Sequence, residues 1–113
     1  MCDFAGLNPP EMVKVRPVVV LTKHRHNSQL VTIIPISTTP PTVIADHHHE
    51  LSANPLPGKQ DIRCWAKCDM VYTLSIARMD RYKVKARNFV TLEISDEDFM
   101  AIKVAVKAAL KLP

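Results

Sequence analysis

The chain has 113 residues, of which 47% are hydrophobic, and it carries a formal net charge of +4 at pH 7. This length and composition suit one modest hydrophobic core, so we expect a single domain over residues 1–113 whose basic surface favours a polyanion such as nucleic acid. No apolar run is long enough to span a membrane, no signal-peptide pattern opens the chain and the three cysteines form no disulfide framework, so we expect a cytoplasmic protein without a membrane partner.

Two β-branched runs separated by a polar connection come first. Residues 13–22 and residues 30–37 are rich in Val and Ile, and the connection between them is hydrophilic. Such runs predict an antiparallel pair of strands. Proline cannot donate a hydrogen bond to a strand ladder, so we expect Pro17 and Pro35 at an edge, a bulge or a strand end.

The middle of the chain predicts loops and short strands. Residues 38–61 are rich in proline and contain Gly58, which indicates a long loop interrupted by a short strand near residues 42–51. We expect another strand around residues 64–70, then a turn or short helix, and a strand near residues 82–84.

The C-terminal segment predicts an amphipathic helix. Ser95 and Asp98 stand at capping-box spacing, and acidic residues fill the first turn. Apolar residues follow at helical spacing, at Phe99, Ile102, Val106, Ala109 and Leu110. Several short strands closed by one terminal helix predict a mainly β (α+β) fold, a small barrel with a helical cap.

An arginine and a hydroxyl cluster stand at corresponding ends of the two β-branched runs. Pro17 favours extended backbone at Arg16, so the guanidinium is presented at the start of a strand. Ser37, Thr38 and Thr39 end the other run, and arginine with hydroxyls is a combination that holds phosphate. An exposed strand-end arginine and an ordinary Ser/Thr turn are the alternatives.

Lys67 and Asp69 are a second candidate pair. Their i, i+2 spacing puts both side chains on one face of a strand, with Cys68 on the other. Such a pair can transfer protons, and it can equally be a surface ion pair.

Three consecutive histidines, His47 to His49, look like a metal tract with Cys64 and Cys68 as possible partners. Consecutive residues of an extended segment cannot all face one ion, and the spacing is not that of zinc sites. We therefore expect no metal and no cofactor. Solvated histidines are the simpler interpretation, although one of them, or His24 or His26, could act as a base.

Four blocks in order resemble the MazF/PemK/Kid family of type II toxin-antitoxin toxins. They are RPVVVL at 16–21, IIPISTT at 33–39, AKCDMVYTL at 66–74 and the closing helix. The resemblance implies an SH3-like or CcdB-like barrel that forms a homodimer and cleaves single-stranded RNA without metal. It also implies a cognate antitoxin that covers the RNA groove.

The resemblance assigns active-site positions to Arg16 and Ser37, with Thr38 as a second contact. Glu11 matches an acidic residue that precedes the RP motif in the family. The Arg-Cys-Asp triplet that supplies proton transfer in the Kid-like branch becomes Lys67-Cys68-Asp69 in this chain.

Three features depart from the family pattern. Pro10 stands where the Kid-like branch has a histidine, and Lys67 replaces an arginine and so loses its bidentate fork. Members usually begin with Gly-Asp and a full first strand, so we expect a truncated first strand here.

The implied reaction is attack of an RNA 2′-hydroxyl on the adjacent phosphate, which gives a 2′,3′-cyclic phosphate and a 5′-hydroxyl and inhibits translation. Asp69 is the candidate base, Lys67 or Arg16 the candidate acid, and Arg16 with Ser37 and Thr38 would stabilise charge on phosphorus. Flanking nucleotides need further cations, for which the candidates are Lys14, Arg25, Arg78 and Arg81.

Two alternatives stay open at this point. The first is a CcdB-like poison that binds gyrase as a protein partner, and the second is a catalytically weak RNA-binding relative. Arginine together with a hydroxyl argues against the first, while the short first strand and Pro10 keep the second open.

Overall fold

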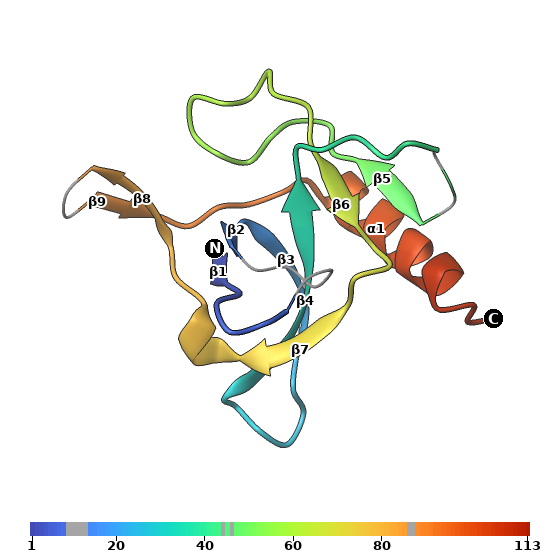
Figure 1. Ribbon diagram of the computed structural model, residues 1–113, viewed down its shortest axis with the longest axis horizontal. Helices are drawn as coiled ribbons and strands as arrows, with labels where there is room; N and C mark the ends of the chain where they lie inside the picture. Colours follow the sequence, from blue (N-terminus) through green and yellow to red (C-terminus); the bar gives the residue numbers. More distant parts are fainter. Residues whose placement is uncertain (9–13, 44, 46, 86–87) are drawn as a thin grey trace.

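The computed structural model describes residues 1–8, 14–43, 45, 47–85 and 88–113 (Figure 1). The described chain is mostly antiparallel β-structure followed by one C-terminal helix, which confirms the expected fold class. In chain order the elements are β1 (Cys2–Asp3), β2 (Val15–Arg16), β3 (Val18–Lys23), β4 (Leu30–Ser37), β5 (His48–Glu50), β6 (Trp65–Lys67), β7 (Tyr72–Ser75), the 3-10 helix η1 (Ile76–Arg78), β8 (Tyr82–Lys85), β9 (Asn88–Val90) and α1 (Asp96–Ala109).

β4 is the central strand of the molecule. It pairs with β3 along one edge, while its other edge pairs first with β7 and then with β6, which carries β5 beyond it. Two small sheets, β1–β2 and β8–β9, complete the described strands, and the β8–β9 hairpin projects away from the body (Figure 1). Neither β7 nor β9 was expected from the sequence.

The side chains of β4 are buried on both faces. Ile34 and Ile36 pack into a core between the sheet and α1, together with Ile102 of the helix. Val31 and Ile33 point the other way, into a second core built around Phe4. Because successive residues of a strand face opposite sides, burial on both faces explains why this segment is almost continuously apolar.

Pro17 lies where the β-branched run expected at 13–22 divides into β2 and β3. Pro35, by contrast, is fully buried inside the central strand β4. This differs from the expectation that it would stand at an edge, a bulge or a strand end. The strand tolerates it because the pairing with β7 stops at Ile33 and that with β6 starts at Ile36. Ile36 N donates to Pro17 O on the β3 side, at 2.9 Å. The preceding residue, Pro35, therefore faces the other side, where its missing N–H falls in the gap between β7 and β6.

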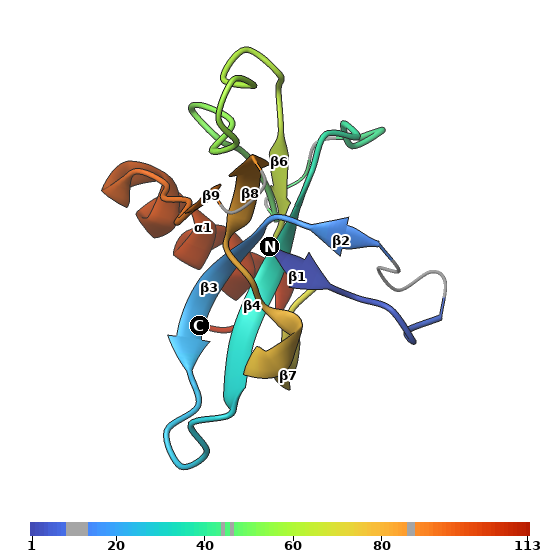
Figure 2. The same cartoon turned by 90° about the vertical axis from the view of Figure 1, so that its left-hand side faces the viewer.

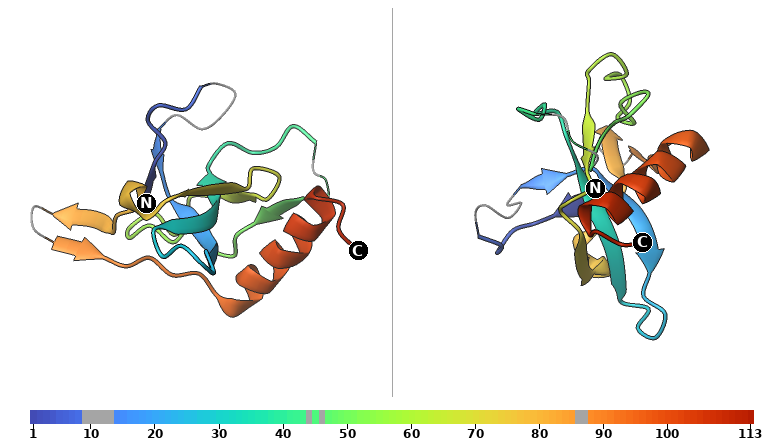
Figure 3. Two further views of the ribbon diagram at one scale, coloured as in Figure 1. Left: turned by 90° about the horizontal axis from the view of Figure 1, so that it is seen from below. Right: turned by 90° about the vertical axis from the view of Figure 1, so that its right-hand side faces the viewer.

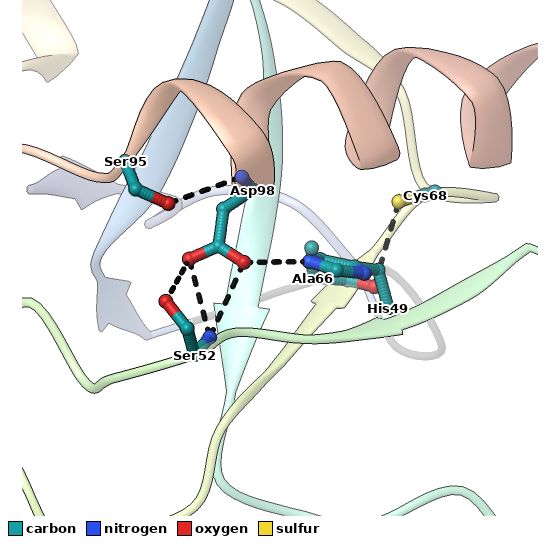
Figure 4. A network of polar contacts seen from close by, with 6 residues as sticks. All are labelled: His49, Ser52, Ala66, Cys68, Ser95 and Asp98. Carbon is teal, nitrogen blue, oxygen red and sulfur yellow. Dashed lines mark hydrogen bonds and ion pairs between the residues drawn. The ribbon is translucent and has the colours of Figure 1, made fainter.

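α1 begins where predicted. Ser95 is the N-cap, and its Oγ accepts a hydrogen bond from Asp98 N at 3.1 Å. The carboxylate of Asp98 does not return to the cap but accepts hydrogen bonds from Ser52 and contacts His49 Nε2 at 2.9 Å (Figure 4). This network fastens the first turn of the helix beside β5, and Figure 3 shows the helix and β5 next to each other.

The remaining strands are shorter than expected. The strand predicted near 42–51 is β5, and the one predicted around 64–70 ends at Lys67, because a turn closed by Met70 N to Lys67 O follows at 2.9 Å. In the part of the chain that the structure describes, no helix has the length and apolar character needed to cross a bilayer.

Candidate active site

Arg16 and Ser37 lie together. Pairing of Val18 with Pro35, continued by two residues along each strand, places Arg16 opposite Ser37, and the hydrogen bond from Ile36 N to Pro17 O holds this register. Both residues line one cavity of about 270 Å³. Thr38 lines it as well, so the arginine and hydroxyls that the sequence placed at corresponding strand ends share one site.

The side chain of Arg16 is partly buried, and its Nε–H has no hydrogen-bond partner among the described residues. Leaving a buried donor unpaired costs about 1–3 kcal/mol. A guanidinium in this state at a cavity wall is suited to bind an acceptor, above all an anion with several oxygens.

Ser37 shapes the turn that follows β4. Its side chain is only 6% exposed, and its Oγ accepts a hydrogen bond from Thr39 N at 3.1 Å. An oxygen that accepts from the backbone keeps its own hydrogen free to donate. Ser37 can therefore donate toward the cavity while it holds the turn.

Lys67 and Asp69 do not form the expected pair. Because β6 ends at Lys67, Asp69 lies in the following turn, and no ion pair joins the two within the described chain. Lys67 Nζ donates to Thr39 O at 3.1 Å, and Asp69 Oδ2 lies 3.7 Å from His47 Nε2. Neither residue lines the cavity, although Lys67 is tied to the turn that Ser37 begins.

The three histidines face different partners. His49 contacts Asp98, whereas His48 Nδ1 accepts a hydrogen bond from Ala45 N at 2.9 Å. Burial, followed by the nearby positive groups of His47 and Lys67, lowers the pKa of His48. Among the described residues no cluster of three His, Cys, Asp or Glu side chains could hold a metal ion.

Other predicted RNA contacts are spread over the molecule. Arg25 is in the connection between β3 and β4, which Figure 2 shows at one end of this strand pair, whereas Arg16 and Ser37 stand at the other end. Arg78 donates to Asp3 O and Ala5 O at 3.0 and 2.8 Å, so it ties η1 to the N-terminal segment. Arg81 stacks over Phe89, with its guanidinium carbon 5.5 Å from the ring centroid.

Two predicted contacts lie in the segment before the RP motif. Lys14 is exposed, and its backbone carbonyl accepts from Phe4 N at 3.4 Å. Glu11 and Pro10 fall outside the described residues.

The cavity also contains residues that the sequence analysis missed. Asn54, Lys59 and Tyr82 line it, and Cys64 adds a buried thiol. Burial, and then the charge of Asp98, raises the pKa of Cys64. The signal that could have pointed to Lys59 is the Pro57-Gly58 pair before it, which predicts a tight turn.

Over residues 1–110 the sequence matches the model of a family described as PemK-like, MazF-like toxin of type II toxin-antitoxin system. The chain belongs to this family. Among curated proteins, none matches the sequence of this family member.

Solved structures similar to this MazF-like chain share its fold. A Mycobacterium tuberculosis toxin MazF-mt6 aligns with a TM-score of 0.66 at 22% identity, over 91% of this chain and 93% of that one. An endoribonuclease from a mycobacterial species aligns with a TM-score of 0.64 at 19% identity, over 99% and 86% of the two chains. An endoribonuclease in complex with its cognate antitoxin, also mycobacterial, aligns with a TM-score of 0.59 at 18% identity, over 87% and 82%.

Proposed function

We propose that this protein is the toxin of a type II toxin-antitoxin system and acts as an endoribonuclease on single-stranded RNA without a metal ion. Membership of the MazF-like family supports the toxin assignment, and two of the similar structures are endoribonucleases. The observation that carries the proposal is the shared cavity of Arg16 and Ser37, in which a partly buried guanidinium has an unpaired Nε–H.

In this proposal the cavity receives the scissile phosphate. The 2′-oxygen of the preceding ribose attacks phosphorus, the bond from phosphorus to the 5′-oxygen breaks, and the ends produced are a 2′,3′-cyclic phosphate and a 5′-hydroxyl. Arg16, Ser37 and Thr38 donate to the phosphate oxygens, where negative charge grows in the transition state. The RNA supplies its own nucleophile.

Proton transfer is assigned to the groups beside the turn after β4. Asp69 takes the proton of the 2′-hydroxyl, and its half-exposed carboxylate, 3.7 Å from His47 Nε2, is open to an incoming strand. Lys67 delivers a proton to the leaving 5′-oxygen, and its bond to Thr39 O keeps it next to the Ser37 turn. Both assignments require the RNA to pass from the cavity over this turn.

The partners in the proposal are single-stranded RNA, a cognate antitoxin and a second copy of the chain. A similar protein was solved with its antitoxin, which supports that partner. The body of the chain, residues 1–90, holds twelve Lys and Arg against seven Asp and Glu, and this excess favours RNA and an acidic segment of an antitoxin alike.

The decisive experiment incubates the purified protein with a long RNA transcript in EDTA and maps both new ends. We expect cleavage that yields 2′,3′-cyclic phosphate and 5′-hydroxyl ends, and much slower cleavage by the Arg16→Ala variant at equal concentration. Inhibition of gyrase supercoiling with intact RNA would instead support the CcdB-like alternative. RNA binding without any cleavage would support a catalytically weak relative.

A further inference from the structure

Lys59 reaches the cavity from a part of the chain that the family motifs do not include. It lies in the long connection between β5 and β6, and it lines the same cavity as Arg16, Ser37 and Thr38. Lys67, the lysine favoured by the motif, is held at Thr39 O outside that lining. The charged side chains that line the cavity among the described residues are those of Arg16 and Lys59, and none is acidic.

A tight turn fixes the backbone of Lys59. Lys59 N donates to Leu56 O at 3.1 Å, which closes a four-residue turn with Pro57 and Gly58 at its centre. Gly58 has a φ of +76°, and proline followed by a residue with positive φ is the pattern of a type II turn. Lys59 O then accepts from Ile62 N at 3.0 Å, so a second turn follows directly.

Asn54 ties this pair of turns to the protein core. Its side chain is only 6% exposed, its Oδ1 accepts from Leu56 N at 2.9 Å and its Nδ2 donates to Ile62 O at 3.2 Å. One buried amide therefore bonds both ends of the segment between 56 and 62. Lys59 is exposed, but hydrogen bonds hold the backbone that carries it in place beside the cavity that it lines.

We propose that Lys59 is a phosphate-binding residue of this site and provides the second positive charge to the RNA phosphate that Arg16 contacts. This inference rests on the proposed function, because it takes the cavity to be the phosphate site. A lysine acts as a flexible point charge, so it neutralises a phosphate without the fixed geometry of arginine. A phosphodiester shared by two cations also fits a cavity without acidic side chains among its described lining residues.

The test compares Lys59→Ala, Lys59→Arg and Lys107→Ala with the wild type. Lys107 is an exposed lysine of the last turn of α1 that does not line the cavity, so its variant removes the same charge elsewhere. Initial rates of cleavage of a long transcript are measured in EDTA at several salt concentrations. Binding of a random-sequence 2′-O-methyl RNA pool, which has no free 2′-hydroxyl, is measured in parallel by fluorescence anisotropy.

We expect Lys59→Ala to cleave roughly 10-fold more slowly at low salt, since one bond to a charged group is lost. Loss of one phosphate contact should also make the slope of log affinity against log salt shallower by about 0.7, while Lys59→Arg and Lys107→Ala keep the wild-type slope. A variant that merely loosened the loop would bind less well at every salt concentration with an unchanged slope.

The outcomes separate this inference from the proposed function. If Arg16→Ala cleaves much more slowly than the wild type but Lys59→Ala matches Lys107→Ala in rate and slope, the role of Lys59 is rejected and the nuclease proposal survives. If the wild type cuts no RNA yet binds the 2′-O-methyl pool with a slope that depends on Lys59, the nuclease proposal is rejected and the phosphate contact stands. If the slope of log affinity against log salt is equal in all four proteins, the phosphate contact of Lys59 is rejected in either case.

Discussion

Arg16 and Ser37 lie opposite each other because the register of β3 and β4 continues past Pro17. Proline ends the ladder of β3, yet its carbonyl still accepts from Ile36 N, so the chain stays aligned up to the arginine. β1 flanks Arg16 on its other side, where Cys2 is its partner. Arg16 is therefore positioned from both sides although it stands at a strand end, and a positioned side chain is what an anion site needs.

Arg16→Ala tests whether the guanidinium serves function and not folding. We expect cleavage to fall roughly 10²- to 10³-fold, as for the loss of one donor to a developing negative charge. Stability should hold or rise, because the substitution removes a donor with no partner among the described residues. Thermal unfolding and initial rates measured on one preparation decide between the two roles, and a marked fall in Tm with normal cleavage would contradict the prediction.

Ser37→Ala and Ser37→Thr form a matched pair. Alanine removes the acceptor of Thr39 N and the hydroxyl donor together, so we expect slower cleavage and a loss of about 1 kcal/mol in unfolding free energy. Threonine retains the hydroxyl and should recover most of the activity. Urea unfolding and RNA cleavage are the measurements, and equal activity of the two variants would exclude a role for the hydroxyl.

Asp98 makes the stability of the fold depend on pH in the acidic range. Burial raises the pKa of this carboxyl, but the hydrogen bonds from Ser52 and His49 outweigh burial, so the pKa is lowered overall from 3.8. Because the pKa of Asp98 is lowered in the folded state, its contribution to the free energy of unfolding is complete above the unfolded-state pKa. This contribution is lost as pH falls through the folded-state pKa.

Asp98→Asn should therefore lower the unfolding free energy at neutral pH by about 1–3 kcal/mol and lessen its dependence on pH below 4. Asp96→Asn is the control, because Asp96 is in the same first turn but is exposed. Urea unfolding across the acidic range is the measurement. Equal losses in the two variants would show that the helix dipole, and not the buried network, is responsible.

The three cysteines should resist alkylation in the folded protein. All are buried, and burial, followed by the charge of Asp69, raises the pKa of Cys68 to about 12. The thiolate is the reactive form, so at pH 8 iodoacetamide should modify none of them until urea unfolds the chain. Mass spectrometry of labelled native protein checks this, and rapid labelling of Cys64 would show that the cavity opens to reagents.

Gly58→Ala tests the turn that carries Lys59. A Cβ at this position meets no atom within 4 Å, so the cost comes from the positive φ alone and should be about 1 kcal/mol. Gly58→Asn, whose side chain tolerates this backbone better, should cost less. Urea unfolding of the two variants gives the comparison. An unchanged free energy of unfolding in Gly58→Ala would contradict the positive φ of this turn.

Local patterns predicted the elements that local chemistry determines. Its almost continuous β-branched, apolar run makes β4 recognisable as a strand, and Ser95 with its acidic first turn marks the start of α1. Arg16 and Ser37 could be brought together because two neighbouring strands align them by register, and the family resemblance pointed to the same positions.

Contacts between residues that are far apart in the sequence could not be predicted from these local patterns. Capping-box spacing suggested that Asp98 would serve its own helix, whereas its carboxylate contacts His49 of the distant strand β5 and accepts hydrogen bonds from Ser52 just after that strand. Lys67 and Asp69 looked like one face of a strand because nothing in the sequence marks the turn that begins after Lys67. Lys59 lines the cavity together with Ser37 at the end of β4, although the two residues are far apart in the sequence and no local pattern connects them.

A double-mutant cycle on RNA cleavage tests the central claim, that Arg16 and Ser37 act on one phosphate. Single-turnover rates on a long transcript in EDTA are measured for the wild type, Arg16→Ala, Ser37→Ala and the double variant. If the two groups hold the same anion, the double variant should be little slower than Arg16→Ala alone, a coupling of about 1 kcal/mol or more. Strictly additive losses would mean that the two side chains act at separate places, and the account would be wrong.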